Sequence, residues 1–264
     1  MTTAERGTPM GVELTRRIMR HVVGIYYDFT LEGERRQVVQ TAFLFSVVGR
    51  WMLMTAGHCI SDIRAFRDRG GILRRCRLID CMGEGAQHIE PVPLSYDDAS
   101  PLPLGIREHI DYGVLFPPDN ACQLLAANNL VPFDEDAWNE EPGEARDYFL
   151  LGFPGELNEY RGNLINVRAS MMRLRRHAER PEDFPEEDPP GMFFYGRAIE
   201  QPLNSLRGFS GGPIVSMSHP DKDGTAHYYL VALQSTSMGD DVKGMLMRPL
   251  GELVREILSR RQGN

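Results

Sequence analysis

The chain has 264 residues, which is enough to bury the core of one large domain or of two small domains that share a cleft. Its formal net charge of -8 argues against nucleic acid as the main partner, because phosphate binding relies on Lys and Arg side chains. The sequence contains no run of about 18 apolar residues, so no transmembrane helix is predicted and no membrane partner is expected. Residues 1–20 contain no continuous apolar segment of the kind that a secretory signal has. We therefore expect a cytoplasmic protein with reduced thiols.

The first half of the chain is predicted to be an arm followed by strands. Residues 1–19 form a polar arm with a short helix expected at 12–20, and residues 20–120 are expected to form a first β-barrel. Segments rich in β-branched and aromatic residues predict strands at 21–27, 38–48, 51–55, 72–82 and 112–116. Residues 117–144, with their Pro, Asn and acidic residues, are predicted to be a connecting loop.

The second half, residues 121–264, is expected to form another barrel. Strands are predicted at 148–155, 163–172, 192–199, 213–217 and 227–234. Residues 173–190 carry a basic run and then an acidic run with prolines, which indicates an exposed loop. Apolar residues at 250, 253, 254, 257 and 258 have helical spacing and predict a C-terminal helix over 249–261. Many short strands and few helices predict an all-β protein of barrel or sandwich type.

The most informative segment for function is 207–215 (RGFSGGPIV), in which Ser210 stands between glycines directly before a predicted strand. Such a tight loop lets the backbone approach a ligand closely, because glycine has no side chain. It can also aim several N–H groups at one point, as a developing oxyanion requires. Taken alone, the short motif is explained equally well by a glycine-rich turn with an incidental serine.

Two further residues carry candidate chemistry. His58 follows a predicted strand that ends in small residues, and an imidazole can exchange a proton near neutral pH, although a structural role is the commoner one for a lone histidine. Asp111 precedes an apolar strand, so we expect it to be partly buried and to need a hydrogen-bond partner. A strand-edge or capping role is the alternative. Asp80, Asp97 and Asp98 compete for the same role, and the last two lie in a loop that is expected to face water.

Taken together, segments 55–59 (TAGHC) and 208–213 (GFSGGP) resemble the two signature segments of the chymotrypsin/trypsin family of serine endopeptidases. The order His58, Asp111, Ser210 matches that family too. The resemblance implies two antiparallel six-stranded β-barrels followed by a C-terminal α-helix, with His58 and Asp111 in the first barrel and Ser210 in the second. It implies a serine endopeptidase that needs no cofactor and no metal and acts on a polypeptide substrate. Because a cytosolic protease must be restrained, a regulatory protein is a possible further partner.

The resemblance also implies residue roles. His58 would take the proton from Ser210, whose oxygen attacks the scissile carbonyl, while Asp111 orients the imidazole. The backbone N–H groups of Gly208 and Ser210 would bind the oxyanion, and an acyl-enzyme would form and be released by water. Asn204 would form the base of the primary specificity pocket. Four more substrate-binding positions are implied, namely Ser235, Thr236, Ser237 and Gly244.

Two positions differ from the secreted members of that family. Phe209 stands where those members carry an aspartate that pairs with a newly cleaved N-terminus, so we do not expect activation by N-terminal trimming. The strand at 38–48 has no cysteine that could bridge to Cys59, which is therefore expected to be a free thiol. Both differences fit an intracellular, bacterial-type member better than a digestive one.

Three alternatives remain open from the sequence. His58, Cys59, Cys76, Cys81 and His88 are residue types that bind zinc, although their spacing contains no C-x-x-C pair. The chain could also be an inactive protease fold that serves as a binding module, although all three triad positions are filled. In the third alternative, the enzyme stays latent until a partner or a stress signal assembles the oxyanion loop.

Overall fold

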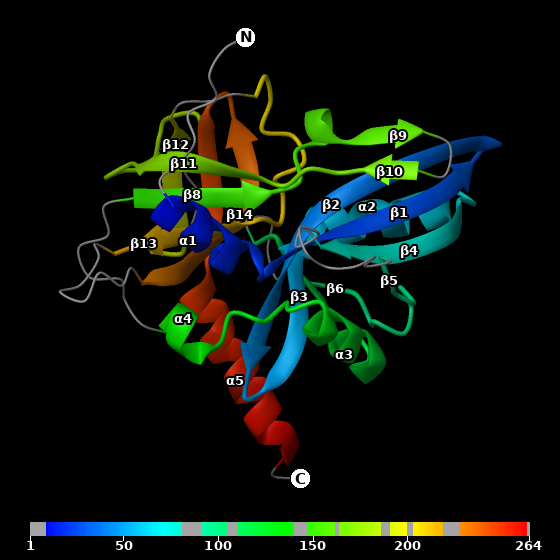
Figure 1. The fold of residues 1–264 in the computed structure, drawn as a ribbon, viewed down its shortest axis with the longest axis horizontal. Helices are drawn as coiled ribbons and strands as arrows, with labels where there is room; N and C mark the ends of the chain where they lie inside the picture. Colours follow the sequence, from blue (N-terminus) through cyan, green and yellow to red (C-terminus); the bar gives the residue numbers. More distant parts are fainter. Residues whose placement is uncertain are drawn as a thin grey trace.

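The computed structural model describes residues 9–80, 91–104, 110–139, 147–161, 164–185, 191–199, 203–218 and 227–262. The predicted N-terminal helix is present as α1 (Pro9–Met19) and begins earlier than expected. Among the helices of the described ranges, none is long and apolar enough to cross a membrane. The remaining elements form two units that lie side by side (Figure 1).

The first unit is a seven-stranded antiparallel sheet in the order β5-β4-β1-β2-β3-β7-β6. Its strands are β1 (Val22–Leu31), β2 (Glu34–Val47), β3 (Arg50–Ala56), β4 (Ile72–Asp80), β5 (Val92–Pro93), β6 (Leu102–Leu104) and β7 (Tyr112–Leu115). We expected a closed barrel here, but within the described residues the sheet has two free edges. Its edge strands β5 and β6 are short and contain Pro93 and Pro103, and proline has no N–H to extend a ladder.

The second unit is a closed six-stranded barrel in the order β11-β12-β15-β14-β13-β8, which confirms one of the two predicted barrels. Its strands are β8 (Asp147–Gly152), β11 (Ser170–Arg176), β12 (Phe193–Ala198), β13 (Pro213–Met217), β14 (Tyr228–Met238) and β15 (Asp241–Leu246). A two-stranded hairpin, β9 (Glu159–Arg161) and β10 (Leu164–Asn166), leaves the barrel and lies over the first sheet in Figure 1. The strand predicted at 163–172 is thus divided between β10 and β11.

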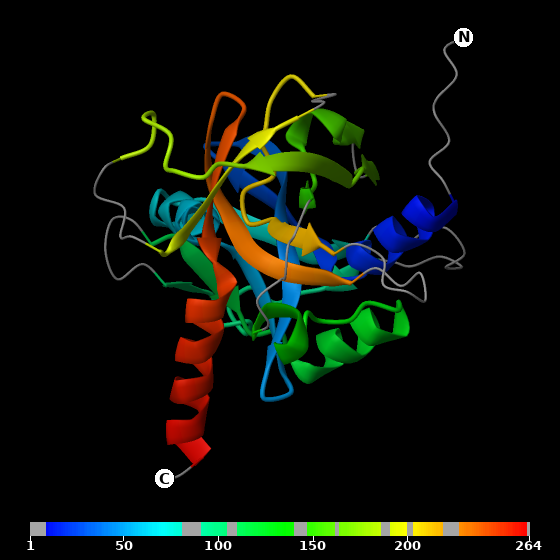
Figure 2. The same ribbon diagram turned by 90° about the vertical axis from the view of Figure 1, so that its left-hand side faces the viewer.

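Several elements differ from the sequence prediction. The predicted connecting loop contains two helices, α3 (Asp119–Ala127) and α4 (Glu135–Asn139), and a further helix, α2 (Gly57–Asp68), follows β3. The basic run at 173–176 is not a loop but part of β11, in which Leu174 is buried in the barrel and the arginines beside it are exposed. The C-terminal helix α5 (Met247–Gln262) is present as expected and projects from the body in Figures 1 and 2.

One apolar core joins the two units. It contains Phe43 and Tyr112 from the sheet together with Phe153, Val215 and Met245 from the barrel. Separate cores fill the inside of the curved sheet and the inside of the barrel. Because burial of apolar surface is the main favourable contribution to folding, the shared core holds the two units in a fixed relation. The boundary between them is where side chains from both can meet.

His21 is a buried polar residue at this boundary, between α1 and β1. The residue is 5 % exposed, and its ring stacks on Phe133 with the centroids 3.9 Å apart. Nδ1 lies 2.8 Å from the carbonyl oxygen of Val131, which can only accept, so Nδ1 carries the proton. Nε2 lies 2.7 Å from the hydroxyl of Tyr228 and accepts its hydrogen bond. Burial lowers the pKa of His21 from 6.5 to about 4.

We expect His21 to make folding stability depend on pH. Because its folded-state pKa is lowered, the unfolded chain binds the proton more strongly between pH 6.5 and 4, and the folded state loses up to about 3 kcal/mol of stability across that window as pH falls. Urea titrations at a series of pH values measure this slope. A His21→Gln variant should flatten it, whereas a matched change at the exposed His227 should not; an unchanged slope in His21→Gln contradicts the assignment.

Candidate active site

The register of two neighbouring strands brings His58 and Asp111 together. β3 pairs with β7 so that Ala56 lies opposite Tyr112, and the two candidate residues lie just beyond this pair. The ring Nδ1 of His58 is 2.7 Å from Oδ2 of Asp111. The backbone N–H of His58 donates to Oδ1 of the same carboxylate at 2.6 Å. Both oxygens of Asp111 therefore hold His58, one through its ring and one through its backbone.

Asp111 also completes the N-terminus of α2. The first N–H groups of a helix have no partner within the helix, and here Ala56 at the N-cap supplies no side-chain acceptor. Oδ1 of Asp111 accepts from His58, and the carbonyl oxygen of Asp111 accepts from Gly57 at 2.8 Å. A carboxylate at this end is favourable to the helix dipole. A Cβ at Gly57 would lie 2.9 Å from Oδ1 of Asp111, so only glycine leaves room for the contact.

The protonation of His58 follows from this contact. The hydrogen bond to Asp111 raises the pKa of His58 from 6.5 to about 10, because the carboxylate stabilises the imidazolium form. The carboxylate accepts from Nδ1, so Nε2 is the ring atom available for proton exchange with another group. With its side chain 44 % exposed, the ring is accessible to a ligand from solvent.

Ser210 lies in a loop that packs against the strand end carrying His58. Both flanking glycines have left-handed backbone conformations, with φ of +97° at Gly208 and +87° at Gly211. A Cβ at Gly211 would lie 2.3 Å from Oγ1 of Thr55, three residues before His58. The thiol of Cys59 lies 3.9 Å from the carbonyl oxygen of Ser210. The loop and the strand end are thus in direct contact.

These contacts bring the loop of Ser210 against the strand end that leads to His58, but within the described residues no hydrogen bond joins the side chains of His58 and Ser210. In enzymes without bound substrate, this contact between base and nucleophile is often long and tightens when substrate binds. Ser210 is half-buried.

The loop at 207–212 that carries the predicted nucleophile Ser210, here called the nucleophile loop, leaves two of its N–H groups unused within the described residues. Three others donate within the protein: those of Phe209, Gly211 and Gly212 bind the carbonyl oxygens of Leu206, Gln234 and Phe209 at 3.2, 2.8 and 2.7 Å. The N–H groups of Gly208 and Ser210 donate to no acceptor among the described residues. They are the two donors that the sequence motif singles out.

The direction of both unused donors is fixed by their own peptide planes. In a trans peptide the C=O and N–H point in opposite directions. The carbonyl of Arg207 accepts from Gly155 at 3.0 Å, which turns the N–H of Gly208 the other way. The carbonyl of Phe209 accepts from Gly212, which does the same for the N–H of Ser210. The site therefore has two oriented, unpaired donors on the nucleophile loop, as stabilisation of an oxyanion requires.

Phe209 anchors this loop by packing. Its side chain is fully buried and belongs to the core of the barrel. A Cβ at Gly152 would lie 2.9 Å from the ring of Phe209, so the barrel wall is shaped around it. Hydrophobic burial thus holds the loop at the position where secreted serine endopeptidases are expected to have a buried ion pair.

The predicted specificity positions divide into two groups. Asn204 is exposed, and its backbone N–H donates to both carboxylate oxygens of Glu156 at 3.1 and 3.2 Å. Glu156 lies in a short 3₁₀ helix, η1 (Gly155–Leu157), beside the nucleophile loop. Sequence reasoning missed this acid, because it lies 48 residues from Asn204 along the chain and no motif includes it.

The remaining specificity positions lie on β14 and β15. Ser235 is buried and donates to the carbonyl oxygen of Lys243 at 3.4 Å, whereas Thr236 and Ser237 are exposed. Gly244 faces the inside of the barrel, since a Cβ there would lie 2.7 Å from the side chain of Ile214. Its substrate-binding role remains a prediction, as do those of the other three.

The competing acids have other partners or positions. Asp80 accepts from the side-chain amide of Asn128 at 2.9 Å, and Asp97 forms a two-point ion pair with Arg67 at 2.5 and 2.8 Å. Asp98 is exposed. Of the four, Asp111 is the one that contacts His58.

Only some of the candidate zinc ligands lie in the part of the chain that the structure describes. Cys59, Cys76 and Cys122 are free thiols, and for Cys59 this agrees with the prediction. Cys81 and His88 lie outside the described residues. Within the described ranges, no group of three or more His, Cys, Asp or Glu residues has the arrangement of a metal site.

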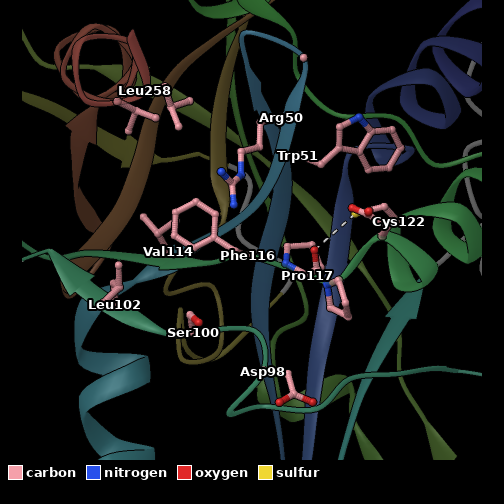
Figure 3. Close-up of a pocket in the computed structure, with 14 residues that line it drawn as sticks. Arg50, Trp51, Asp98, Ser100, Leu102, Val114, Phe116, Pro117, Cys122 and Leu258 are labelled. Atoms are coloured by element: carbon pink, nitrogen blue, oxygen red, sulfur yellow. Dashed lines mark hydrogen bonds between the residues drawn. The ribbon is translucent and has the colours of Figure 1, made fainter. Parts of the chain in front are cut away.

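A large cavity of about 1000 Å³ lies away from these residues. It is formed where β3 begins and β7 ends, whereas His58 and Asp111 lie at the opposite ends of the same strands. Figure 3 shows the guanidinium of Arg50 beside the ring of Phe116, with 5.2 Å to the ring centroid. The lining includes Asp98, one of the competing acids, but not His58, Asp111 or Ser210, so the cavity is separate from the candidate active site.

Comparisons with known proteins show which solved structures have a similar fold. No family model and no curated protein matches the chain. A thermostable serine protease, AL20, from an extremophilic microorganism has 13 % identity and a TM-score of 0.50, with 90 % of this chain and 95 % of that one covered.

Two further solved structures are similar. A structure titled GrC has 11 % identity and a TM-score of 0.55, with 91 % of this chain and 95 % of that one covered. The protease Anisep from Arthrobacter nicotinovorans has 16 % identity and a TM-score of 0.47, with 86 % and 90 % covered. At such identities the likeness concerns the fold alone, and one closed barrel beside a second sheet is consistent with a chymotrypsin-like fold.

Proposed function

We propose that this chain is a serine endopeptidase that hydrolyses peptide bonds with Ser210 as nucleophile, His58 as general base and Asp111 as the group that orients His58. One observation carries the proposal. A histidine whose ring and backbone N–H are both held by one carboxylate lies beside a serine loop with two oriented, unused N–H groups. A purely structural glycine-rich turn has no need of either feature.

The chemistry follows the order of bond changes in this class of enzyme. The Oγ of Ser210 attacks the scissile carbonyl carbon while Nε2 of His58 removes the hydroxyl proton. The imidazolium, stabilised by Asp111, then gives that proton to the departing amine as the C–N bond breaks. Water repeats the sequence on the acyl-enzyme and regenerates Ser210. The N–H groups of Gly208 and Ser210 stabilise the negative oxygen, with about 3 kcal/mol lost when one such donor is removed.

We propose further that the enzyme needs no N-terminal trimming and no assembly of the oxyanion loop by a partner. The support is the buried Phe209 together with the fixed peptides of the loop. Free thiols at Cys59, Cys76 and Cys122 support a cytoplasmic, bacterial-type enzyme. In this proposal a regulatory protein would act on access of the polypeptide substrate rather than on the catalytic geometry.

A protease-fold binding module is the second candidate function, favoured by the missing hydrogen bond between His58 and Ser210. Incubation with a fluorophosphonate probe, followed by mass spectrometry of the peptides, separates the two. We expect one adduct, on Ser210. A folded protein that stays unlabelled would identify the binding module instead. Profiling of cleavage products in a peptide library then defines the substrate preference, including the effect of Glu156 beside Asn204.

A further inference from the structure

Thr41, in β2 of the first sheet, makes side-chain hydrogen bonds to the second unit. Its hydroxyl donates to the carbonyl oxygen of Gly208 at 2.6 Å and accepts from the backbone N–H of Phe153 at 2.8 Å. The residue is fully buried, so neither bond is exchanged with water. A hydroxyl has one proton to donate and lone pairs to accept, which is what these two partners require.

The barrel is shaped to receive this hydroxyl. A Cβ at Gly152, the residue before Phe153, would lie 2.8 Å from Oγ1 of Thr41 and 3.1 Å from its methyl carbon. Only glycine at this position therefore lets the end of β8 approach β2 closely. Because Gly152 has no side chain, the side chain of Thr41 can occupy the space beside it.

The hydroxyl of Thr41 acts on the peptide between the two proposed oxyanion donors. The peptides on either side, which carry the N–H groups of Gly208 and Ser210, are held through their own carbonyls. The middle peptide has the carbonyl of Gly208 and the N–H of Phe209, and Thr41 binds that carbonyl. Because Gly208 is a glycine in the left-handed region, its backbone has unusual freedom to rotate, and an external hydrogen bond is what fixes it.

Thr41 connects the same loop to the strand that carries His58. Its carbonyl oxygen accepts from the buried hydroxyl of Thr55 in β3 at 2.8 Å. A Cβ at Gly211 would lie 2.4 Å from that same carbonyl oxygen, so the nucleophile loop rests directly on it. One residue thus contacts the strand of the proposed base, the loop of the proposed nucleophile and the middle peptide of the oxyanion site.

We infer that Thr41 is a positioning residue, whose hydroxyl fixes the peptide between the two oxyanion donors and so holds the donors in place relative to each other and to the strand that leads to His58. The inference rests on the proposed function. Thr41 is fully buried and acts through the Gly208 peptide rather than as a substrate ligand. Its contribution should therefore appear in the transition state, where the oxyanion exists, and not in the binding of a ground-state peptide.

The test compares Thr41→Val, which keeps the shape and removes the hydroxyl, with Thr41→Ser, which keeps the hydroxyl. We expect Thr41→Val to lower kcat by about 10- to 100-fold with little change in KM, less than the loss of about 10²- to 10³-fold on removal of a donor itself. Thr41→Ser should stay within about threefold of wild type. Thr30→Val, at a buried threonine hydroxyl without a hydrogen-bond partner in the described residues, is the matched control.

A second readout separates positioning from a general loss of structure. Thr41→Val should weaken binding of a peptide aldehyde, which forms the tetrahedral adduct, by the same factor as kcat, and leave binding of a product peptide unchanged. If Thr41→Val does not fold, Thr41→Cys, a similar volume with a weaker donor, should show an intermediate loss with the same split. Wild-type kcat in Thr41→Val, no rescue by serine, or equal losses in aldehyde and product binding would each overturn the inference. A wild-type protein inert to substrate and phosphonate would overturn the proposed function as well.

Discussion

Replacement of Ser210 by alanine should lower kcat by about 10⁶-fold, the size of effect expected when the nucleophile of a serine protease is removed. Without the hydroxyl no acyl-enzyme can form, and the oxyanion donors and the binding cleft supply only the residual rate. Active-site titration with the fluorophosphonate probe should fall to zero in the same variant. Hydrolysis of a peptide substrate selected from library profiling measures the rate.

The matched control is Ser216→Ala, six residues further along. Ser216 is fully buried in β13, and its hydroxyl has no hydrogen-bond partner in the described part of the chain. Its removal should leave both labelling and hydrolysis at wild-type levels. Hydrolysis that persists in Ser210→Ala at the wild-type rate would show that another nucleophile or a contaminating protease performs the reaction.

The sequence pointed to His58 and Asp111, which the structure brings into contact, and to the Ser210 loop, which packs against the same strand end. Short motifs at 55–59 and 208–213 point to His58 and Ser210, and Asp111 stands where an apolar strand begins. Motifs of this kind are visible because glycine and small residues are required wherever backbones approach closely. Gly57 and Gly211 are two such positions, because a Cβ at either would lie less than 3 Å from a neighbouring atom.

Other parts could not be predicted because they depend on contacts between distant segments. Glu156 is an exposed acid with no sequence signal, and only the fold brings it to Asn204. Thr41 is one of several β-branched residues in β2, and its role depends on hydrogen bonds with Gly208 and Phe153 of the other unit. Closure of the first sheet was predicted from family resemblance, but within the described residues its edge strands β5 and β6 do not pair with each other.

Helix α2 (Gly57–Asp68), which contains His58, also depends on a contact between distant segments. Residues 57–68 have no capping side chain at their start, so the sequence gives little indication that a helix begins there. The missing cap is supplied by Asp111, 53 residues away from His58. Asp111 therefore has two functions, one in folding and one in orienting the imidazole, and a substitution must distinguish between them.

Asp111→Asn is the change that makes this distinction. An asparagine oxygen can still accept from the backbone N–H of His58, so α2 keeps its cap and the fold is retained. Its NH₂ group, however, would donate to Nδ1 of His58, which places the imidazole proton on Nε2 and prevents it from accepting the proton of Ser210. We expect kcat to fall by about 10⁴-fold, the loss found for the equivalent change in the Ser-His-Asp template.

The pH profile provides an independent measurement on the same variant. Only the neutral imidazole of His58 can accept the proton of Ser210, and Asp111 raises the pKa of His58 above 6.5. In the wild type, kcat/KM should therefore continue to increase with pH above 6.5. In Asp111→Asn the charge is gone, and the remaining activity should reach its plateau at lower pH. Asp97→Asn, at a surface carboxylate paired with Arg67 near the end of α2, should change neither rate nor profile. A wild-type rate in Asp111→Asn with an unshifted profile would mean that the carboxylate only caps the helix.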